Sequence, residues 1–169
     1  GCKYDNMPIL IGEQGCGKST FCERMALHPE FFTDSVRGVG DKEAIEQILG
    51  SWIVEWGEMS AMRRARDAES LKLFISQCKD KCRKAYSRNT VVIPRMCVFI
   101  GTSNDKDGLL TDRTANRRFF PVEVTRGQKS LWHENVQHEF EQMYAEAKEL
   151  YKAGFDLKVP KALTEVVAA

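Results

Sequence analysis

Short apolar runs alternate along the chain with segments whose apolar residues recur at helical spacing. The first run, Met7 to Ile11, ends at Gly12, and the helical pattern that begins at Ser19 is closed by Pro29. Further strands are predicted at 31–37, 52–56, 96–101 and 118–124, a basic hairpin or extended arm at 79–94, and further helices at 41–49, 60–78 and 132–151. Strands that alternate with helices predict a three-layer α/β sandwich with a mostly parallel central sheet.

Composition and charge set bounds on this picture. With 169 residues, 43% of them hydrophobic, the chain can bury one core. We therefore expect one domain over 1–169, with a core at 7–125 and a helical segment at 128–169, excised from a longer protein. The net charge of +1 does not favour nucleic acid or membrane over the whole surface. Because no apolar run approaches the roughly 18 residues of a membrane span and no signal-peptide pattern is present, a cytoplasmic location is expected, with the six cysteines reduced and structural.

The segment between the first strand and the first helix carries the clearest chemical signal. It reads Gly-Glu-Gln-Gly-Cys-Gly-Lys-Ser from Gly12 to Ser19, which matches the G-x-x-x-x-G-K-S/T pattern of phosphate-binding loops. Glycines let backbone N–H groups turn toward the phosphates, Lys18 reaches the β- and γ-phosphates, and Ser19 coordinates Mg²⁺. The sequence therefore predicts nucleoside triphosphate binding by Gly12, Glu13, Gln14, Gly15, Cys16, Gly17, Lys18, Ser19 and Thr20.

Two carboxylates and one amide follow the strands predicted next to this loop. Glu55 and Glu58 lie at the end of the 52–56 strand, where one can hold the Mg²⁺ shell and the other can orient the attacking water. Either acid fits either task, and we favour Glu55 for the metal and Glu58 for the water. Asn104 follows the 96–101 strand, where its amide can sense the γ-phosphate, although an asparagine after a strand is commonly a turn residue.

Basic residues form two further groups. Arg117 and Arg118, with Arg113 upstream, precede the last strand; they fit either a decorated strand edge or a charge supplied to a neighbouring subunit's phosphate. Residues 62–88 contain nine lysines or arginines and three acidic residues, a net of +6. This stretch fits a solvated face as well as a DNA contact made by Arg83, Lys84, Tyr86 and Arg88.

Taken together, these residues resemble the virulence-associated protein E family. Its members are P-loop proteins of phages, plasmids and pathogenicity islands, related to superfamily 3 helicases and primase-helicases. The resemblance extends from Gly12 to Val124. Its motifs, in the family's order, are the phosphate loop, Trp52 to Met62, Asp80 to Arg83 with Tyr86 to Arg88, Val98 to Asn104, and Asp112 to Pro121.

The resemblance implies a role for each of these motifs. Glu55 and Glu58 become Walker B acids, Asn104 a sensor, and Arg117 or Arg118 an arginine finger that acts across a subunit boundary. The stretch at 80–88 becomes a hairpin that contacts DNA in the pore of a ring. Two departures from the family pattern are that Trp56 and Gly57 separate the two acids, and that Ala115 stands where the family has glycine.

The resulting expectation is a P-loop NTPase domain of the ASCE or AAA+-like type, in a bacterial or phage-infected cell. We expect it to hydrolyse ATP with Mg²⁺ and to act on single-stranded or forked DNA as a hexamer-like ring in phage or mobile-element replication. An ATP-dependent assembly or regulatory switch without DNA translocation is the alternative. A small-molecule kinase shares the loop but needs a lid, and the sequence shows no lid-like insertion.

Overall fold

Five parallel strands form the centre of the protein. The computed structural model describes residues 4–36, 38–39, 42–57, 65–82, 90–104, 118–126, 135–157 and 159–160. The central sheet consists of β1 (Met7–Ile11), β2 (Phe32–Thr33), β3 (Ile53–Trp56), β6 (Val98–Ser103) and β7 (Phe119–Glu123). Their order across the sheet is β2-β3-β6-β1-β7, and every neighbouring pair is parallel. The predicted α/β class and parallel sheet are therefore confirmed.

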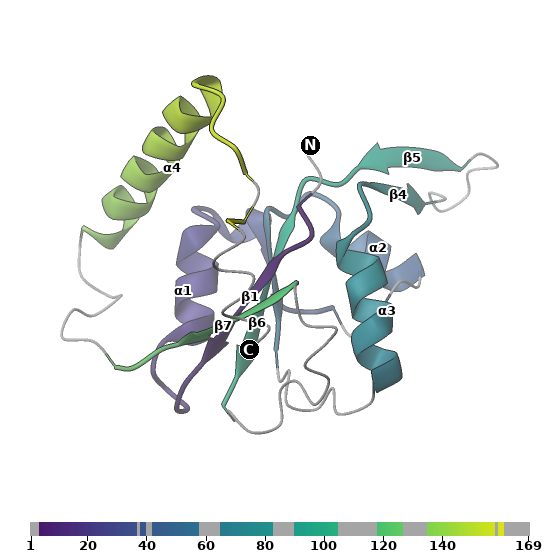
Figure 1. Cartoon of the computed structure of the whole chain (residues 1–169), viewed down its shortest axis with the longest axis horizontal. Coiled ribbons are helices and arrows are strands. Elements are labelled where there is room, and N and C mark those ends of the chain that lie inside the picture. The colour runs from purple at the N-terminus through teal and green to yellow at the C-terminus, as the bar shows by residue number, and fades with distance from the viewer. Residues whose placement is uncertain are drawn as a thin grey trace.

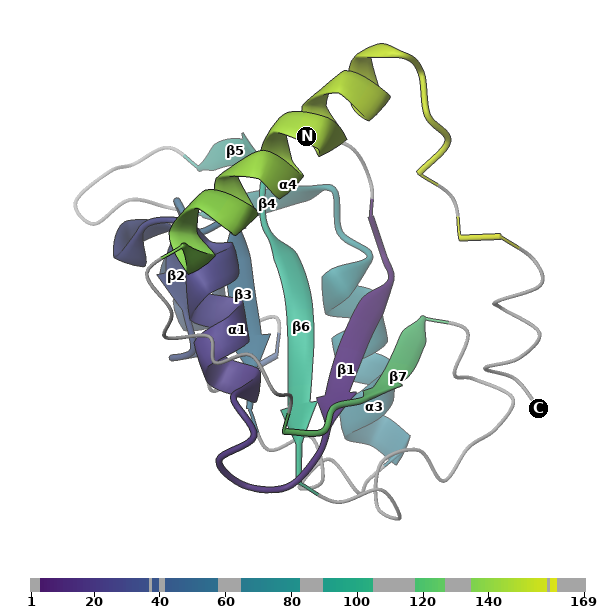
Figure 2. The same cartoon turned by 90° about the vertical axis from the view of Figure 1, so that its left-hand side faces the viewer.

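Helices cover both faces of this sheet, which gives three layers (Figure 1). One face carries α1 and α4, and the other carries α2 and α3 (Figures 1 and 2). The helices are α1 (Lys18–Met25), α2 (Lys42–Ile48), α3 (Ala65–Ile75) and α4 (Val136–Lys152), with a short 3₁₀ turn η1 at Pro29–Phe31. Among the described residues, none of the helices is long and apolar enough to cross a membrane.

The alternation of side chains along β1 shows how the layers are held together. Met7, Ile9 and Ile11 belong to a buried cluster with α2 and α3, whereas Leu10 belongs to a second cluster with Cys22 of α1. Successive side chains of a strand point to opposite faces, so each face of the sheet has its own apolar contact with helices. This two-sided burial explains why the strand reads as a continuous apolar run in the sequence.

All five strands end at the same edge of the sheet, because they are parallel. Ile11, the last residue of β1, pairs with Ser103 of β6 and with Glu123 of β7. The loop after β1, the end of β3 and the residue after β6 therefore meet at one place. Figure 2 shows the β1–α1 loop at this edge and the β4–β5 hairpin at the opposite one.

Strand β7 is an edge strand of the sheet and contains a proline. The Val124 N–H donates to Ile11 O, and Arg118 O accepts from the Met7 N–H. Even-numbered residues of β7 therefore direct their backbone groups toward β1. Pro121, an odd-numbered residue, directs its nitrogen away from β1, at a position where a missing N–H costs no ladder hydrogen bond.

The predicted arm is a hairpin of β4 (Lys79–Cys82) and β5 (Val91–Pro94), which pair antiparallel. Arg95 follows it and holds it to the rest of the protein. Its guanidinium donates to the carboxylate of Asp80, with Nε 2.9 Å from Oδ2, and to the backbone carbonyl of Phe74 in α3. It also lies over the rings of Phe74 and Phe99, 4.4 and 5.4 Å from their centroids. The four residues proposed to contact DNA, Arg83, Lys84, Tyr86 and Arg88, lie outside the described residues.

Two strand boundaries differ from the sequence expectation. Strand β6 runs from Val98 to Ser103 rather than from 96 to 101, because the chain first has to leave the hairpin anchor at Arg95, with Met96 69% exposed on the way. Strand β2 has two residues, where the apolar pattern suggested a run over 31–37. The rings of Phe31 and Trp52 stack 4.2 Å apart, so part of that apolar signal comes from packing beside the sheet and not from strand pairing.

Candidate functional site

The loop after β1 has a backbone that requires glycine at three positions. Gly15 and Gly17 have φ values of +81° and +94°, which other residues rarely adopt. At Gly12, a Cβ atom would lie 2.2 Å from the carbonyl oxygen of Val124, so a side chain there would collide with the end of β7. The glycines thus allow a tight loop that leads directly into α1, whose N-cap is Gly17.

Lys18, the first residue of α1, turns its side chain back across this loop. Its Nζ donates to the carbonyl oxygens of Gly12 and Glu13, at 2.8 and 2.9 Å, and to Oδ1 of Asn104 at 2.9 Å. The residue is 8% exposed. The loop and the end of β6 therefore hold an ammonium group in one fixed place, as a site for phosphate oxygens requires.

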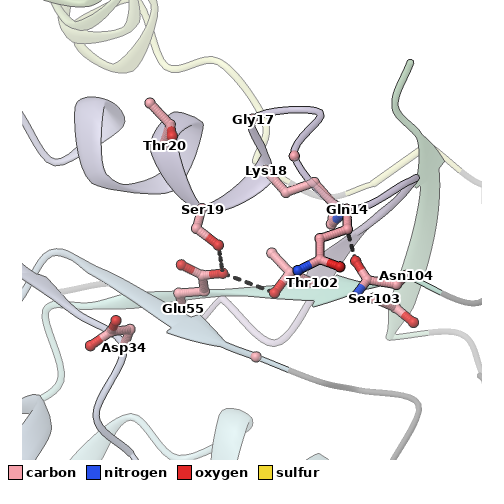
Figure 3. A pocket seen from close by; sticks show the side chains of 12 residues that line it. Gln14, Gly17, Lys18, Ser19, Thr20, Asp34, Glu55, Thr102, Ser103 and Asn104 are labelled. Atoms are coloured by element: carbon pink, nitrogen blue, oxygen red, sulfur yellow. Dashed lines mark hydrogen bonds between the residues drawn. The ribbon is translucent and has the colours of Figure 1, made fainter. Parts of the chain in front are cut away.

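Glu55 of β3 lies next to Ser19 at the start of α1. Its Oε1 accepts hydrogen bonds from Ser19 Oγ at 2.6 Å and from Thr102 Oγ1 at 2.8 Å (Figure 3). The carboxylate is almost fully buried, with 4% of the residue exposed. Burial, followed by the negative charge of Glu55, raises the pKa of the nearby Cys22 thiol to about 12. Two strands and one helix thus fix the position of a single carboxylate.

These groups surround a cavity of about 560 Å³ at the carboxyl edge of the sheet. Its lining is mostly polar and comes from the loop, α1 and the ends of β2, β3 and β6. The lining residues are Gln14, Gly15, Gly17, Lys18, Ser19, Thr20, Asp34, Glu55, Gly57, Thr102, Ser103 and Asn104. Figure 3 shows several of these side chains converging on the same space.

The donor set fits a nucleoside triphosphate with a magnesium ion. A helix N-terminus preceded by glycines and a buried ammonium group suit phosphate oxygens. Mg²⁺ in such sites takes few protein ligands and keeps several waters, so the Ser19 hydroxyl with the Glu55 carboxylate beside it suits Mg²⁺. Lys18 and Asn104 would face the phosphates, and Ser19 with Glu55 would hold the metal.

The structure brings most of the predicted site residues together but leaves some elsewhere. The loop residues Gly12, Glu13 and Cys16 line another cavity, of about 370 Å³, that also touches Asn104 and the end of β7. Arg118 lies before β7, and its Nε is 3.4 Å from Asp5 Oδ2, at the opposite edge of the sheet from the cavity. The two ends of β1 are roughly 13 Å apart, so Arg118 does not belong to this chain's own cavity. Glu58 and Arg117 lie outside the described residues.

Three polar residues of the cavity, Thr102, Ser103 and Asp34, were not predicted from the sequence. Thr102 and Ser103 come after the expected 96–101 strand but belong to β6 in the structure, where the Thr102 hydroxyl supports Glu55. Asp34 follows β2, a strand whose two residues give almost no periodic signal. For Thr102 and Ser103 the available clue was their position directly after the expected 96–101 strand, since polar residues after parallel strands meet at one edge of the sheet.

Comparisons with known proteins agree with this architecture. Two solved structures of the NrS-1 C terminal region, both described as the A form in the apo state, are similar in fold, with TM-scores of 0.55 and 0.52 at 21% and 18% sequence identity. They cover 96% and 82% of this chain, whereas this chain covers 42% and 33% of theirs. The chain thus spans less than half the length of these relatives. No curated protein matches it.

The remaining comparison addresses the family directly. The family model described as "Virulence-associated protein E-like domain" matches residues 1–169, the whole of the chain. The motifs that carry the resemblance include those placed around the cavity, from the phosphate-type loop to the end of β6. The chain therefore belongs to the virulence-associated protein E-like domain family.

Proposed function

We propose that this domain binds ATP with Mg²⁺, hydrolyses the ATP, and acts on DNA as one subunit of a ring. One observation carries the proposal: Lys18, Ser19, Glu55 and Asn104 lie around one cavity where the parallel strands end. The cavity opens beside a glycine loop that joins the first strand to the first helix, which is the setting of a P-loop NTPase. Membership of the family and the fold shared with the NrS-1 region support the proposal.

Each side chain would have one task in this reaction. The Lys18 ammonium, already placed by two carbonyl oxygens, would neutralise charge on the β- and γ-phosphates. The exposed amide of Asn104 would contact the γ-phosphate and its attacking water. Mg²⁺, when bound, supplies positive charge against the phosphate oxygens. Glu58 would orient the water, and Arg117 or Arg118 would act on a neighbouring subunit's phosphate.

The link to DNA is proposed from the hairpin and its place in the chain. Its basic residues precede β5, which leads through Arg95 into β6, and the other end of β6 carries Asn104. A single strand of six residues, roughly 20 Å long, thus joins the hairpin anchor to the nucleotide cavity. A shift of β6 on hydrolysis would move the hairpin, and DNA that is held there would move with it.

ATPase activity measured against protein concentration, with and without single-stranded DNA, tests catalysis and assembly together. Lys18→Ala should lower turnover by roughly 100-fold or more, because it removes charged hydrogen bonds to the phosphates. The matched control is Lys42→Ala, since this lysine lies on α2 with a 62% exposed side chain paired to Glu46. The proposal fails if the assembled wild type shows no ATPase activity with DNA present and Lys18→Ala changes nothing.

A second experiment separates a DNA motor from an assembly switch. Replacement of Arg83, Lys84 and Arg88 by alanine should abolish the stimulation of ATPase activity by DNA while basal turnover stays within about twofold. A switch without DNA translocation would show equal turnover in the variant and the wild type, with and without DNA. The control replaces Lys148 and Lys152, two exposed residues of α4, by alanine.

A further inference from the structure

A second carboxylate, that of Asp34, lies directly after the strand next to Glu55. In β2 and β3, Phe32 pairs with Ile53 and Thr33 pairs with Val54. Continuing the register by one residue sets Asp34 opposite Glu55. Paired residues of adjacent parallel strands lie roughly 4.8 Å apart and direct their side chains to the same face. Both acids accordingly line the 560 Å³ cavity, and Figure 3 shows both carboxylates there.

The two carboxylates have different surroundings. Glu55 is enclosed, and its Oε1 accepts from both Ser19 and Thr102. Asp34 is exposed to the cavity, and the Ser35 hydroxyl donates to its Oδ1 at 3.3 Å. The oxygens of Asp34 are thus accessible to water in the cavity. Across the sheet Glu55 has Thr102 of β6 on one side and Asp34 after β2 on the other.

The negative charges of Asp34 and Glu55 favour a cation in the cavity. Two neighbouring carboxylates repel each other when both are ionised, and the Lys18 ammonium is directed to the loop carbonyls and Asn104 rather than to them. A divalent cation beside the Ser19 hydroxyl would offset both negative charges. Mg²⁺ normally keeps several of its waters, and these waters donate to carboxylates that do not touch the metal.

We propose that Asp34 is a positioning residue for the magnesium ion, and that it accepts hydrogen bonds from metal-bound water on the side of Glu55 away from Thr102. The inference rests on the proposed function, since it uses the same metal–nucleotide site. Ser19 would contact the metal directly, Glu55 would hold Ser19 and one part of the water shell, and Asp34 would hold another part. The site should therefore prefer a metal ion that keeps its bound waters, because Asp34 would contact the ion through water.

The test measures metal affinity and not turnover alone. Mn²⁺ binding to the protein with ADP present is followed by electron paramagnetic resonance for the wild type, Asp34→Asn and the control Glu30→Gln, an exposed carboxylate on η1 outside the cavity lining. Asp34→Asn should weaken Mn²⁺ binding about tenfold or more, as loss of an outer-shell partner does. It should raise the Mg²⁺ concentration for half-maximal ATPase activity by a similar factor. Metal-free ADP binding and the thermal unfolding midpoint should stay as in the wild type.

The other outcomes each decide a question. Unchanged Mn²⁺ affinity in Asp34→Asn overturns the inference, and if turnover at saturating Mg²⁺ falls at the same time, Asp34 acts on the attacking water instead. Failure of the proposed function is distinct, because then the wild type itself neither hydrolyses ATP nor binds Mn²⁺ more tightly when ADP is present. If Asp34→Asn lowers the unfolding midpoint, Asp34→Ser serves as a second variant, since it keeps a short polar side chain. It should lose Mn²⁺ affinity while its unfolding midpoint stays normal. A normal Mn²⁺ affinity in Asp34→Ser also overturns the inference.

Discussion

At the scale of single residues, the contact between Gly12 and Val124 joins the phosphate-type loop to the last strand of the sheet. Because a Cβ atom at position 12 would lie 2.2 Å from the Val124 carbonyl oxygen, Gly12→Ala should push the loop and the end of β7 apart. We expect the free energy of unfolding to fall by about 1–3 kcal/mol and ATP affinity to fall with it. Urea denaturation and titration with a fluorescent ATP analogue measure the two effects.

The control for this substitution is Gly57→Ala. A Cβ atom at Gly57 would meet nothing within 4 Å, so the free energy of unfolding should stay within about 0.5 kcal/mol of the wild type. If Gly12→Ala is as stable as Gly57→Ala and binds ATP normally, the close approach of loop and strand does not constrain the site.

Cys22 makes the stability of the protein depend on alkaline pH. Burial first, and Glu55 second, raise the pKa of its thiol from 9.0 to about 12. The contribution of this raised pKa to the free energy of unfolding is fully present below pH 9 and is lost as the pH rises toward 12. The reason is that the thiol of the unfolded chain ionises at lower pH than the thiol of the folded protein. Cys22→Ala should make the decline of the unfolding free energy between pH 9 and 10.5 shallower by up to about 1.4 kcal/mol per pH unit.

The measurement is a series of urea denaturations across that pH range. Cys78→Ala serves as the control, since Cys78 is exposed and its removal should leave the slope unchanged. Cys97, whose burial raises its pKa to about 11, should contribute a similar slope in both variants. Equal slopes in Cys22→Ala and the wild type would contradict the prediction.

The residues of the cavity differ in how far the sequence could reveal them. The loop from Gly12 to Thr20 has fixed spacing, so its members could be named from the sequence alone. Glu55 lies near the end of one clear apolar run and Asn104 follows another, and both line the cavity. Asp34 could not be found, because a strand of two residues has no period and its register with β3 depends on tertiary contacts. The roles of all these side chains stay predictions.

At the scale of elements, the buried pair of Arg95 and Asp80 fixes the hairpin to α3 and β6. Both side chains are about 95% buried, with 5% and 4% exposed. Arg95→Met would leave the Asp80 carboxylate buried without its partner and should lower the free energy of unfolding by about 3–5 kcal/mol. In the double variant Arg95→Met with Asp80→Leu, both charges are gone, so the loss should be clearly smaller. Urea denaturation of the three proteins checks this.

Arg126→Met is the matched control, because Arg126 is exposed after β7 and its replacement should change stability little. A double variant that is only as stable as Arg95→Met would show that the loss comes from the missing packing of Arg95 on Phe74 and Phe99 and not from the unpaired charge of Asp80.

The elements were predictable in type and less so in extent. The runs at Met7 to Ile11 and 52–56 appear as strands because both their faces are buried, so their sequence is apolar apart from Glu55, which lines the cavity. The hairpin of β4 and β5 was visible from its β-branched residues. The order β2-β3-β6-β1-β7 could not be read from the sequence, because the connections from β1 to β2 and from β6 to β7 join strands that are not neighbours, and local patterns do not record which strands pair.

At the scale of the whole molecule, Arg118 faces the opposite edge of the sheet from the cavity. If Arg117 or Arg118 completes the site of a neighbouring subunit, two inactive variants should restore activity when mixed. The first variant carries Lys18→Ala, and the second carries both Arg117→Ala and Arg118→Ala. Each variant should be inactive by itself. A mixture should contain interfaces that join the normal cavity of one variant to the normal arginines of the other. ATPase activity measured against the mixing ratio should rise to a maximum between the pure variants.

The control is the same titration at a protein concentration too low for assembly, where no recovery is expected. Single replacements then show which arginine acts, and the pairing of Arg118 with Asp5 favours Arg117. A flat activity across all mixing ratios, with assembly confirmed by light scattering, would contradict the action of these arginines across subunits.

The proline at position 121 has a consequence for how copies of the domain can meet. Its nitrogen faces away from β1 and has no hydrogen to donate, so a strand from another molecule could not form a regular ladder along β7. At the opposite border of the sheet, β2 has two residues with which a strand of another molecule could pair. Neither border of the sheet, within the described residues, is a good template for strand addition or fibrillar aggregation. Copies of the domain would therefore not join by strand pairing at these two borders, and contacts of other kinds can loosen and re-form without unzipping a shared sheet.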